Sequence, residues 1–242
     1  MGTTPKYKRV LIKLSGHAFQ GNREAGIDFE ALESLALEIA QVKKLGCDIA
    51  IVNGAGNLFR GSSGAKHGMD EPVGHYIGMI ATVMNALALQ DALEQVGIAT
   101  RVLSAIEMQK VAEPYIRRKA IRHMEKGRIV ICAGGIGSPF FTTDTAGVLR
   151  AIELDCGIMI KASNIDGVYN KDPKVEKGAV KYSELSYGEV LKRNLRVLDA
   201  TAISLAREKS LPIIVIDYFK KGSLKQAVEG KKIGTIIGQD KS

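Results

Sequence analysis

The stretch IAIVNGAGNLFRG, residues 49–61, joins a strand-like apolar run to a glycine-rich loop. The same arrangement occurs twice more, because KLSG (13–16) follows the run 7–12 and GGIGSP (134–139) follows the run 129–132. Glycine lets backbone N–H groups turn toward a ligand and lets that ligand approach closely. At the carboxyl end of a parallel strand such N–H groups form an anion site. Three such loops predict an enzyme that holds several phosphates side by side.

The pattern of apolar residues predicts an α/β fold. Strand-like runs rich in Val and Ile occur at 7–12, 47–53, 98–103, 128–133, 157–161 and 211–217, with a weaker one at 233–237. Helical patterns lie between them at 28–45, 72–96, 114–125, 143–155 and 199–209, and Asp28 is placed to cap the first of these. Alternating strands and helices predict a three-layer sandwich around a mainly parallel sheet.

The 242 residues are enough for one large α/β domain or two small ones. No long linker or repeat divides residues 1–242. Residues 163–195 contain fewer long apolar runs, and we expect them to form a lid-like region over the site.

Charge and cysteine content restrict the class of protein. The net charge of +8 indicates an anionic partner, whether nucleotide, nucleic acid or membrane surface, and does not choose among them. Cys47, Cys132 and Cys156 lie in or beside strand-like runs without any CxxC pair. They are typical of small buried hydrophobic residues in a reducing compartment.

Residues 72–90 contain no Asp, Glu, Lys or Arg and are long enough to cross a bilayer. Five polar or amphipathic side chains make this segment too polar for a membrane span: His75, Tyr76, Thr82, Asn85 and Gln90. A helix buried within the fold or at a subunit interface is the better interpretation, and we expect no membrane association.

Several motifs of nucleotide and metal enzymes are absent. The sequence has no GxxxxGK[ST] and no GxGxxG that opens a helix after a strand, so it is not an ordinary P-loop enzyme. It has no HExxH and no Cys/His cluster for a transition metal.

Charged residues beside the glycine loops are the candidates for phosphate chemistry. Lys13 ends the first strand-like run, where a cation meets the β,γ-phosphates of a nucleotide, although a strand-end lysine is commonly only solvated. Arg60 closes the second loop, and its planar guanidinium fits a phosphate. Asp144 follows the FFTT run (140–143), whose hydroxyls and free helix-start amides form an anion site. The simpler interpretation of Asp144 is a helix cap.

These motifs resemble a known family. DGVYNKDP (166–173) is similar to the nucleotide-side signature of the amino acid kinase family. GNLFRG (56–61), PFFTTD (139–144), MIATVMN (79–85) and VLD (197–199) resemble its bacterial uridylate (UMP) kinase branch. The resemblance extends without large gaps from about residue 7 to 237.

The resemblance implies a single α/β domain that works as a cytoplasmic homohexamer. It implies transfer of the γ-phosphoryl group of ATP, as its Mg²⁺ complex, to UMP in pyrimidine nucleotide biosynthesis. UMP is already largely ionised at neutral pH, since the second pKa of a phosphate monoester is about 6, so no general base is required. Catalysis is then positioning plus charge neutralisation. We expect phosphates and water to hold the Mg²⁺, with no protein ligand.

The resemblance also implies roles for particular residues. The catalytic set is Lys13, Arg60, Asp144 and Asp199. The ATP-binding set is Lys13, Leu14, Ser15, Gly16, Gly56, Arg60, Ser163, Tyr169 and Asp172. The UMP-binding set is Ala55, His75, Ile136, Gly137, Ser138, Pro139, Phe140, Phe141, Thr142 and Thr143.

Several positions depart from the branch pattern. KLSGE becomes KLSGH at His17, and GGGN becomes GAGN at Ala55. GTGNP becomes GIGSP, so that Ile136 replaces a hydroxyl, and His75 replaces an aspartate that contacts the UMP ribose in the family. These departures concern the phosphoryl acceptor more than the phosphoryl donor.

Two other functions remain open on the sequence. One is a kinase of the same fold that acts on a carboxylate or carbamate. The other is a nucleic-acid-binding regulator, since residues 117–128 carry a basic stretch: Arg117, Arg118, Lys119, Arg122, His123, Lys126 and Arg128. Such a stretch is more often a solvated helix face, so we do not expect nucleic acid binding.

Overall fold

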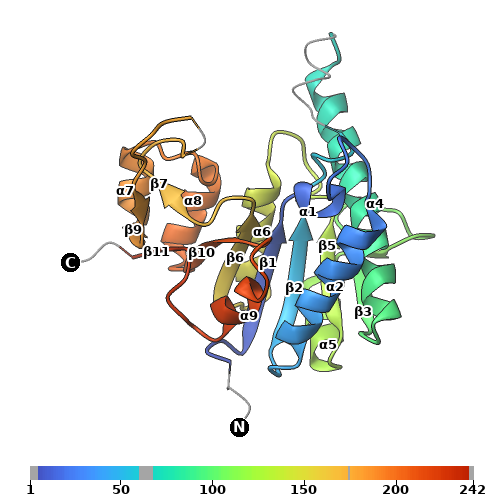
Figure 1. Cartoon of the computed structure of the whole chain (residues 1–242). Helices are drawn as coiled ribbons and strands as arrows, with labels where there is room; N and C mark the ends of the chain where they lie inside the picture. The colour runs from blue at the N-terminus through green and yellow to red at the C-terminus, as the bar shows by residue number, and fades with distance from the viewer. Residues whose placement is uncertain (1–4, 60–67, 174, 240–242) are drawn as a thin grey trace.

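The computed structural model describes residues 5–59, 68–173 and 175–239, and its central element is a nine-stranded sheet (Figure 1). The strand order is β4-β3-β5-β2-β1-β6-β10-β11-β9. The strands are β1 (Arg9–Leu14), β2 (Asp48–Asn53), β3 (Thr100–Ser104), β4 (Glu113–Pro114), β5 (Ile129–Ala133), β6 (Ile158–Ser163), β9 (Glu184–Ser186), β10 (Ile213–Asp217) and β11 (Thr235–Gly238). β10 and β11 pair antiparallel, and the other neighbours in this sheet are parallel.

Helices cover both faces of the sheet. One face carries α1 (His17–Gln20), α2 (Phe29–Lys43), α4 (Glu71–Gln95) and α9 (Ser223–Val228). The other carries α5 (Arg117–Glu125), α6 (Thr143–Glu153), α7 (Tyr187–Lys192) and α8 (Ala200–Glu208). The predicted three-layer α/β sandwich is therefore confirmed.

The period-two pattern of the strands explains how one sheet serves two cores. In β1, Val10, Ile12 and Leu14 belong to the core beneath α2 and α4, whereas Leu11 belongs to the core beneath α6 and α8. Successive strand residues point to opposite faces, so a strand buried on both sides must be apolar at nearly every position. This is why the central strands were visible in the sequence as continuous Val/Ile runs.

All seven predicted strands and all five predicted helices are present. Asp28 caps α2 as predicted, because its Oδ1 accepts hydrogen bonds from the N–H groups of Glu30 and Ala31. The three cysteines are buried and free. The elements that the pattern did not predict are α1, α7, α9, β4 and β7–β9, which have only two to six residues each. Segments of that length are too short to show a period.

Residues 163–195 contain a small antiparallel sheet separate from the main one. It consists of β7 (Val168–Tyr169) and β8 (Lys181–Tyr182), and it is followed by β9 and α7. β9 joins the edge of the main sheet beside β11. Figure 1 shows β7, α7 and α8 on the side of the molecule away from α4.

Candidate functional site

The first two glycine loops meet at the carboxyl ends of β1 and β2. The N–H of Gly54 donates to the carbonyl of Leu14 at 2.8 Å. A Cβ atom at Gly16 would lie 2.6 Å from the backbone nitrogen of Gly56, so no larger residue fits between the two loops. Close packing of backbone on backbone, rather than an unusual φ, is the reason that position 16 requires glycine.

A cluster of buried asparagines holds the second loop in place. Asn57 and Asn85 exchange hydrogen bonds of 2.8 and 3.1 Å between their side-chain amides. Asn85 also donates to the carbonyl of Gly54 at 2.9 Å, and Asn53 donates to the carbonyl of Thr82 at 2.9 Å. Buried amide groups that are paired in this way fix a loop in one conformation, since breaking any pair leaves a desolvated polar group.

Asp144 lies between two lysines at the centre of the site. Lys13 Nζ is 2.8 Å from Asp144 Oδ1, and Lys161 Nζ donates to Oδ2 at 2.6 Å. Lys13 and Lys161 are register partners on the adjacent parallel strands β1 and β6. Burial acts to raise the pKa of Asp144, but the two ammonium groups outweigh it and hold that pKa below its ordinary value. Burial lowers the pKa of Lys161, and Asp144 opposes that shift in part.

The helix-cap interpretation of Asp144 is wrong. The cap of α6 is Thr142, whose Oγ1 accepts from the N–H groups of Asp144 and Thr145 at 3.0 and 3.3 Å. Asp144 lies in the first turn, and its carboxylate is directed to the lysines. A carboxylate in the first turn is also favoured by the helix dipole.

Asp199 joins the starts of two helices. It caps α8 by accepting from the N–H of Ala202 at 2.9 Å. It also accepts from the hydroxyl of Thr145 at 2.8 Å and from the hydroxyl of Thr142. Asp199 therefore fixes the first turn of α6, which carries Asp144.

One cavity, the lysine cavity, opens beside Lys13 and Lys161 and measures about 750 Å³. Five of the residues in the implied ATP-binding set line it: Lys13, Ser15, Ser163, Tyr169 and Asp172. His17 lines it as well, with Nδ1 3.2 Å from Ser15 Oγ. Among the described residues no group of three or more His, Cys, Asp or Glu side chains is placed to hold a metal ion.

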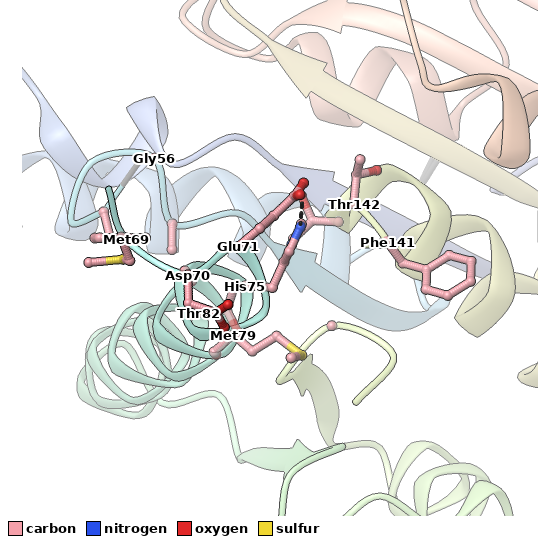
Figure 2. Close-up of a pocket in the computed structure, with 15 residues that line it drawn as sticks. Gly56, Met69, Asp70, Glu71, His75, Met79, Thr82, Phe141 and Thr142 are labelled. Atoms are coloured by element: carbon pink, nitrogen blue, oxygen red, sulfur yellow. Dashed lines mark hydrogen bonds and ion pairs between the residues drawn. The ribbon is translucent and has the colours of Figure 1, made fainter. Parts of the chain in front are cut away.

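A second cavity of about 540 Å³, the α4 cavity, lies between α4 and the start of α6 (Figure 2). Six predicted residues line it: Ala55, Gly56, His75, Phe141, Thr142 and Thr143. Gly56, which the resemblance places at the ATP phosphates or the reaction centre, is one of these six. Asp70, Glu71 and Thr82 also line the cavity. Figure 2 shows the side chain of Glu71 directed to that of His75, with Oε1 and Nε2 3.8 Å apart.

The structure does not bring every predicted acceptor residue to this cavity. Residues 136–140 are not among those that line it. The side chain of Ile136 packs against the core beneath α6, and Phe140 has a φ of 69° with its ring 5.1 Å from that of His75. Arg60 lies outside the described residues.

Lys161 is the main functional candidate that the sequence motifs did not indicate. Its signal was present in the sequence, because Lys161 ends the apolar run 157–161 in the same way that Lys13 ends the first run. What the sequence lacked was the pairing of β1 with β6, which places the two lysines side by side.

The two cavities adjoin the two ends of one charged cluster. Lys13 and Lys161 line the lysine cavity, whereas Thr142 and Thr143, at the start of the helix that carries Asp144, line the α4 cavity. Glycine loops, helix-start amides and two largely buried cations suit the transfer of an anionic group between two ligands.

Comparison with known proteins agrees with this class of site. The family model of the amino acid kinase family matches residues 8–217. The chain therefore belongs to the amino acid kinase family. A solved UMP kinase from Bacillus anthracis is similar with a TM-score of 0.94 and 39% identity, over 97% of each chain.

Two further solved structures are similar over nearly the whole chain. UMP kinase from Ureaplasma parvum gives a TM-score of 0.91 and 34% identity, over 97% of this chain and 100% of that one. Uridylate kinase from Archaeoglobus fulgidus gives a TM-score of 0.74 and 27% identity, over 95% of this chain and 99% of that one.

Proposed function

We propose that this protein is an ATP-dependent UMP kinase, which transfers the γ-phosphoryl group of ATP to UMP and releases UDP and ADP. The main support for the proposal is the similarity to solved UMP kinases over 97% of this chain. The two cavities beside the cluster of Lys13, Asp144 and Lys161 agree with it. In this proposal the enzyme supplies UDP in pyrimidine nucleotide biosynthesis in the cytoplasm.

ATP would occupy the lysine cavity, with Mg²⁺ entering as part of the Mg-ATP substrate. Lys13 and Lys161 neutralise the developing charge on the transferred phosphoryl group, while Asp144 keeps both ammonium groups in register. The Ser15 hydroxyl would donate beside them, and Tyr169, which also lines the cavity, would contact the nucleoside part of ATP. Residues 163–195, which supply Ser163, Tyr169 and Asp172, act as a lid over this substrate.

UMP would occupy the α4 cavity. Its phosphate must face the lysine cavity for transfer, so the amides and hydroxyls at the start of α6 are its partners. The acidic end of the cavity, at Asp70 and Glu71, then faces the nucleoside part of UMP, because carboxylates accept from hydroxyls and repel phosphate.

Measurement of ADP release tests the proposal. Purified protein with Mg-ATP is given UMP, CMP, AMP, a carboxylate, carbamate or no acceptor. We expect ADP release that depends on UMP and exceeds the release with every other acceptor. Turnover with carboxylate or carbamate but not UMP would establish the alternative kinase. Sequence-dependent binding to nucleic acid without turnover would establish the regulator.

The position of His75 leads to a prediction about discrimination between UMP and dUMP. It lines the α4 cavity, and an imidazole offers at most one acceptor nitrogen where a carboxylate would accept two hydrogen bonds. We expect His75→Asp to lower KM for UMP and to raise the preference for UMP over dUMP about tenfold, since an unpaired polar group costs about 1–3 kcal/mol. The measurement is kcat/KM for UMP and dUMP.

His75→Gln is the matched control for this prediction, because it keeps an acceptor oxygen and adds no charge. We expect it to change the UMP/dUMP preference less than twofold. Equal preferences in wild type, His75→Asp and His75→Gln would show that this side chain does not face the ribose.

The exposed side of α4 predicts self-association. By length and composition α4 could cross a membrane, and 44% of its apolar window is buried inside the molecule. Four large apolar residues on its exposed side recur every three or four positions: Val73, Tyr76, Ile80 and Met84. Figure 1 shows the first turns of α4 beyond the body of the molecule. We propose that this surface packs against another copy within a homohexamer.

Light scattering on the detergent-free protein tests this assembly. We expect a mass several times 26.1 kDa for wild type, and a smaller species for the pair Ile80→Asp and Met84→Asp, since each buried apolar side chain contributes about 1.5–3 kcal/mol. Leu37→Asp, at a similarly exposed leucine of α2, is the control and should leave the mass unchanged. A wild-type monomer at micromolar concentration contradicts the proposal.

A further inference from the structure

We propose that Arg150, a buried arginine of α6, is a positioning residue that holds the third glycine loop in the conformation that binds the phosphoryl acceptor. This inference rests on the proposed function, since it concerns the affinity of the same site for UMP. Arg150 was not among the residues that motif or resemblance indicated.

Arg150 is held in a closed cluster beneath the loop. Only 5% of its surface is exposed. Its Nη1 donates to Glu153 Oε2 at 2.7 Å, and its guanidinium carbon lies 3.8 Å from the centre of the Tyr115 ring. The Tyr115 hydroxyl donates to the same Glu153 oxygen at 2.7 Å. Glu153 neutralises the guanidinium and the ring covers it, so the arginine has one fixed orientation.

In that orientation the guanidinium of Arg150 reaches the third glycine loop, residues 134–139. Its Nη2 donates to the carbonyl of Gly135 at 3.3 Å. Gly134, Gly135 and Gly137 have φ values of 75°, 59° and 86°, a region that side chains disfavour. Gly135 lines the α4 cavity. Arg150 therefore hydrogen-bonds to the loop at Gly135, the residue where the loop lines the cavity proposed for UMP.

A second contact fixes the loop from the opposite layer. The N–H of Gly134 donates to Thr82 Oγ1 at 2.8 Å, and the Thr82 hydroxyl donates in turn to the carbonyl of Met79 at 2.6 Å. Thr82 belongs to α4 and Arg150 to α6, so helices on both faces of the sheet hold two peptides of the same glycine loop, 133–134 and 135–136.

The hydrogen bond from Arg150 to the carbonyl of Gly135 also determines where the N–H of the same peptide points. The C=O and N–H of a trans peptide point in opposite directions. Because Arg150 holds the carbonyl of Gly135, the N–H of Ile136 is turned to the other side of the loop. None of the described residues accepts a hydrogen bond from that N–H. We infer that Arg150 keeps this donor available to the acceptor nucleotide.

Arg150→Lys tests the positioning role. Lysine keeps the positive charge beside Glu153 but lacks the planar fork that reaches both Glu153 and Gly135. We expect KM for UMP to rise about tenfold while KM for ATP changes less than twofold. Tyr115→Phe is the matched control, because it keeps the ring over the guanidinium and does not touch the loop. It should change KM for UMP less than twofold.

A merely structural role would give a different pattern. If Arg150 only joins α6 to Tyr115, Arg150→Lys lowers the melting temperature and leaves KM for UMP unchanged, and the proposal is wrong. If Arg150→Lys does not fold, the double variant Arg150→Met with Glu153→Gln removes both charges together. Its dissociation constant for UMP should still exceed that of wild type about tenfold.

Calorimetric titration with UMP separates this inference from the proposed function. Absence of UMP-dependent turnover in wild type contradicts the proposed function. Equal UMP dissociation constants for wild type and folded Arg150 variants contradict the positioning role, whatever the turnover.

Discussion

Lys13→Ala is expected to lower kcat about 100- to 1000-fold, the usual loss when one electrostatic stabiliser of a transition state is removed. Lys13 lines the lysine cavity, and its side chain is only 9% exposed, so water cannot replace its charge efficiently. Asp144 stays paired with Lys161 in this variant, and the fold should therefore persist. The measurement is ADP release at saturating ATP and UMP, with circular dichroism as the test of folding.

Lys8→Ala is the control for this variant. Lys8 is exposed and directly precedes β1, whereas Lys13 lies near the carboxyl end of that strand. It should leave kcat unchanged. Asp199→Asn should lower kcat by a similar factor to Lys13→Ala, since Asp199 fixes the first turn of α6 through Thr142 and Thr145. Wild-type turnover in both Lys13→Ala and Asp199→Asn would remove these residues from the mechanism.

Asp144→Asn is expected to lower both activity and stability. The substitution leaves two largely buried ammonium groups without their shared carboxylate, and breaking a buried ion pair from one side costs about 3–5 kcal/mol. We expect a loss of free energy of unfolding near the lower end of that range, since the asparagine oxygen still accepts one hydrogen bond. Urea unfolding at pH 7 measures it.

The pH dependence of stability tests whether the loss in Asp144→Asn comes from the missing carboxylate charge. The pKa of Asp144 lies below its ordinary value in the folded protein. The contribution of Asp144 to the free energy of unfolding is therefore at its full value well above the pKa of the unfolded chain, about 3.9. It is lost as pH falls through the lower pKa of the folded protein. The difference between wild type and Asp144→Asn should shrink on acidification below about pH 4.

Asp155→Asn is the control for the stability prediction. Asp155 pairs with Arg117 at 2.6 Å, but its side chain is 66% exposed. Exposed pairs contribute about 1 kcal/mol or less, so this variant should unfold close to wild type. Equal losses in Asp144→Asn and Asp155→Asn would mean that burial does not strengthen the central cluster.

The sequence by itself determined the elements of this fold. Strands buried on both faces must be apolar at nearly every position, and helices that cover them must be apolar every three or four residues. These patterns are local, so the seven strands and five longer helices could be located without the structure. The motifs likewise indicated part of the lining of both cavities, including Lys13, His75 and Thr142.

Only the tertiary structure decided which of these residues meet. Lys161 joins Lys13 because β6 pairs with β1 in register, and that pairing links segments far apart in the chain. Thr82 and Arg150 reach the third glycine loop from opposite layers of the sandwich. The side chain of Ile136 packs against the core beneath α6, a direction that its motif position did not indicate. Strand order, register and side-chain direction arise from packing between distant segments, which no local pattern records.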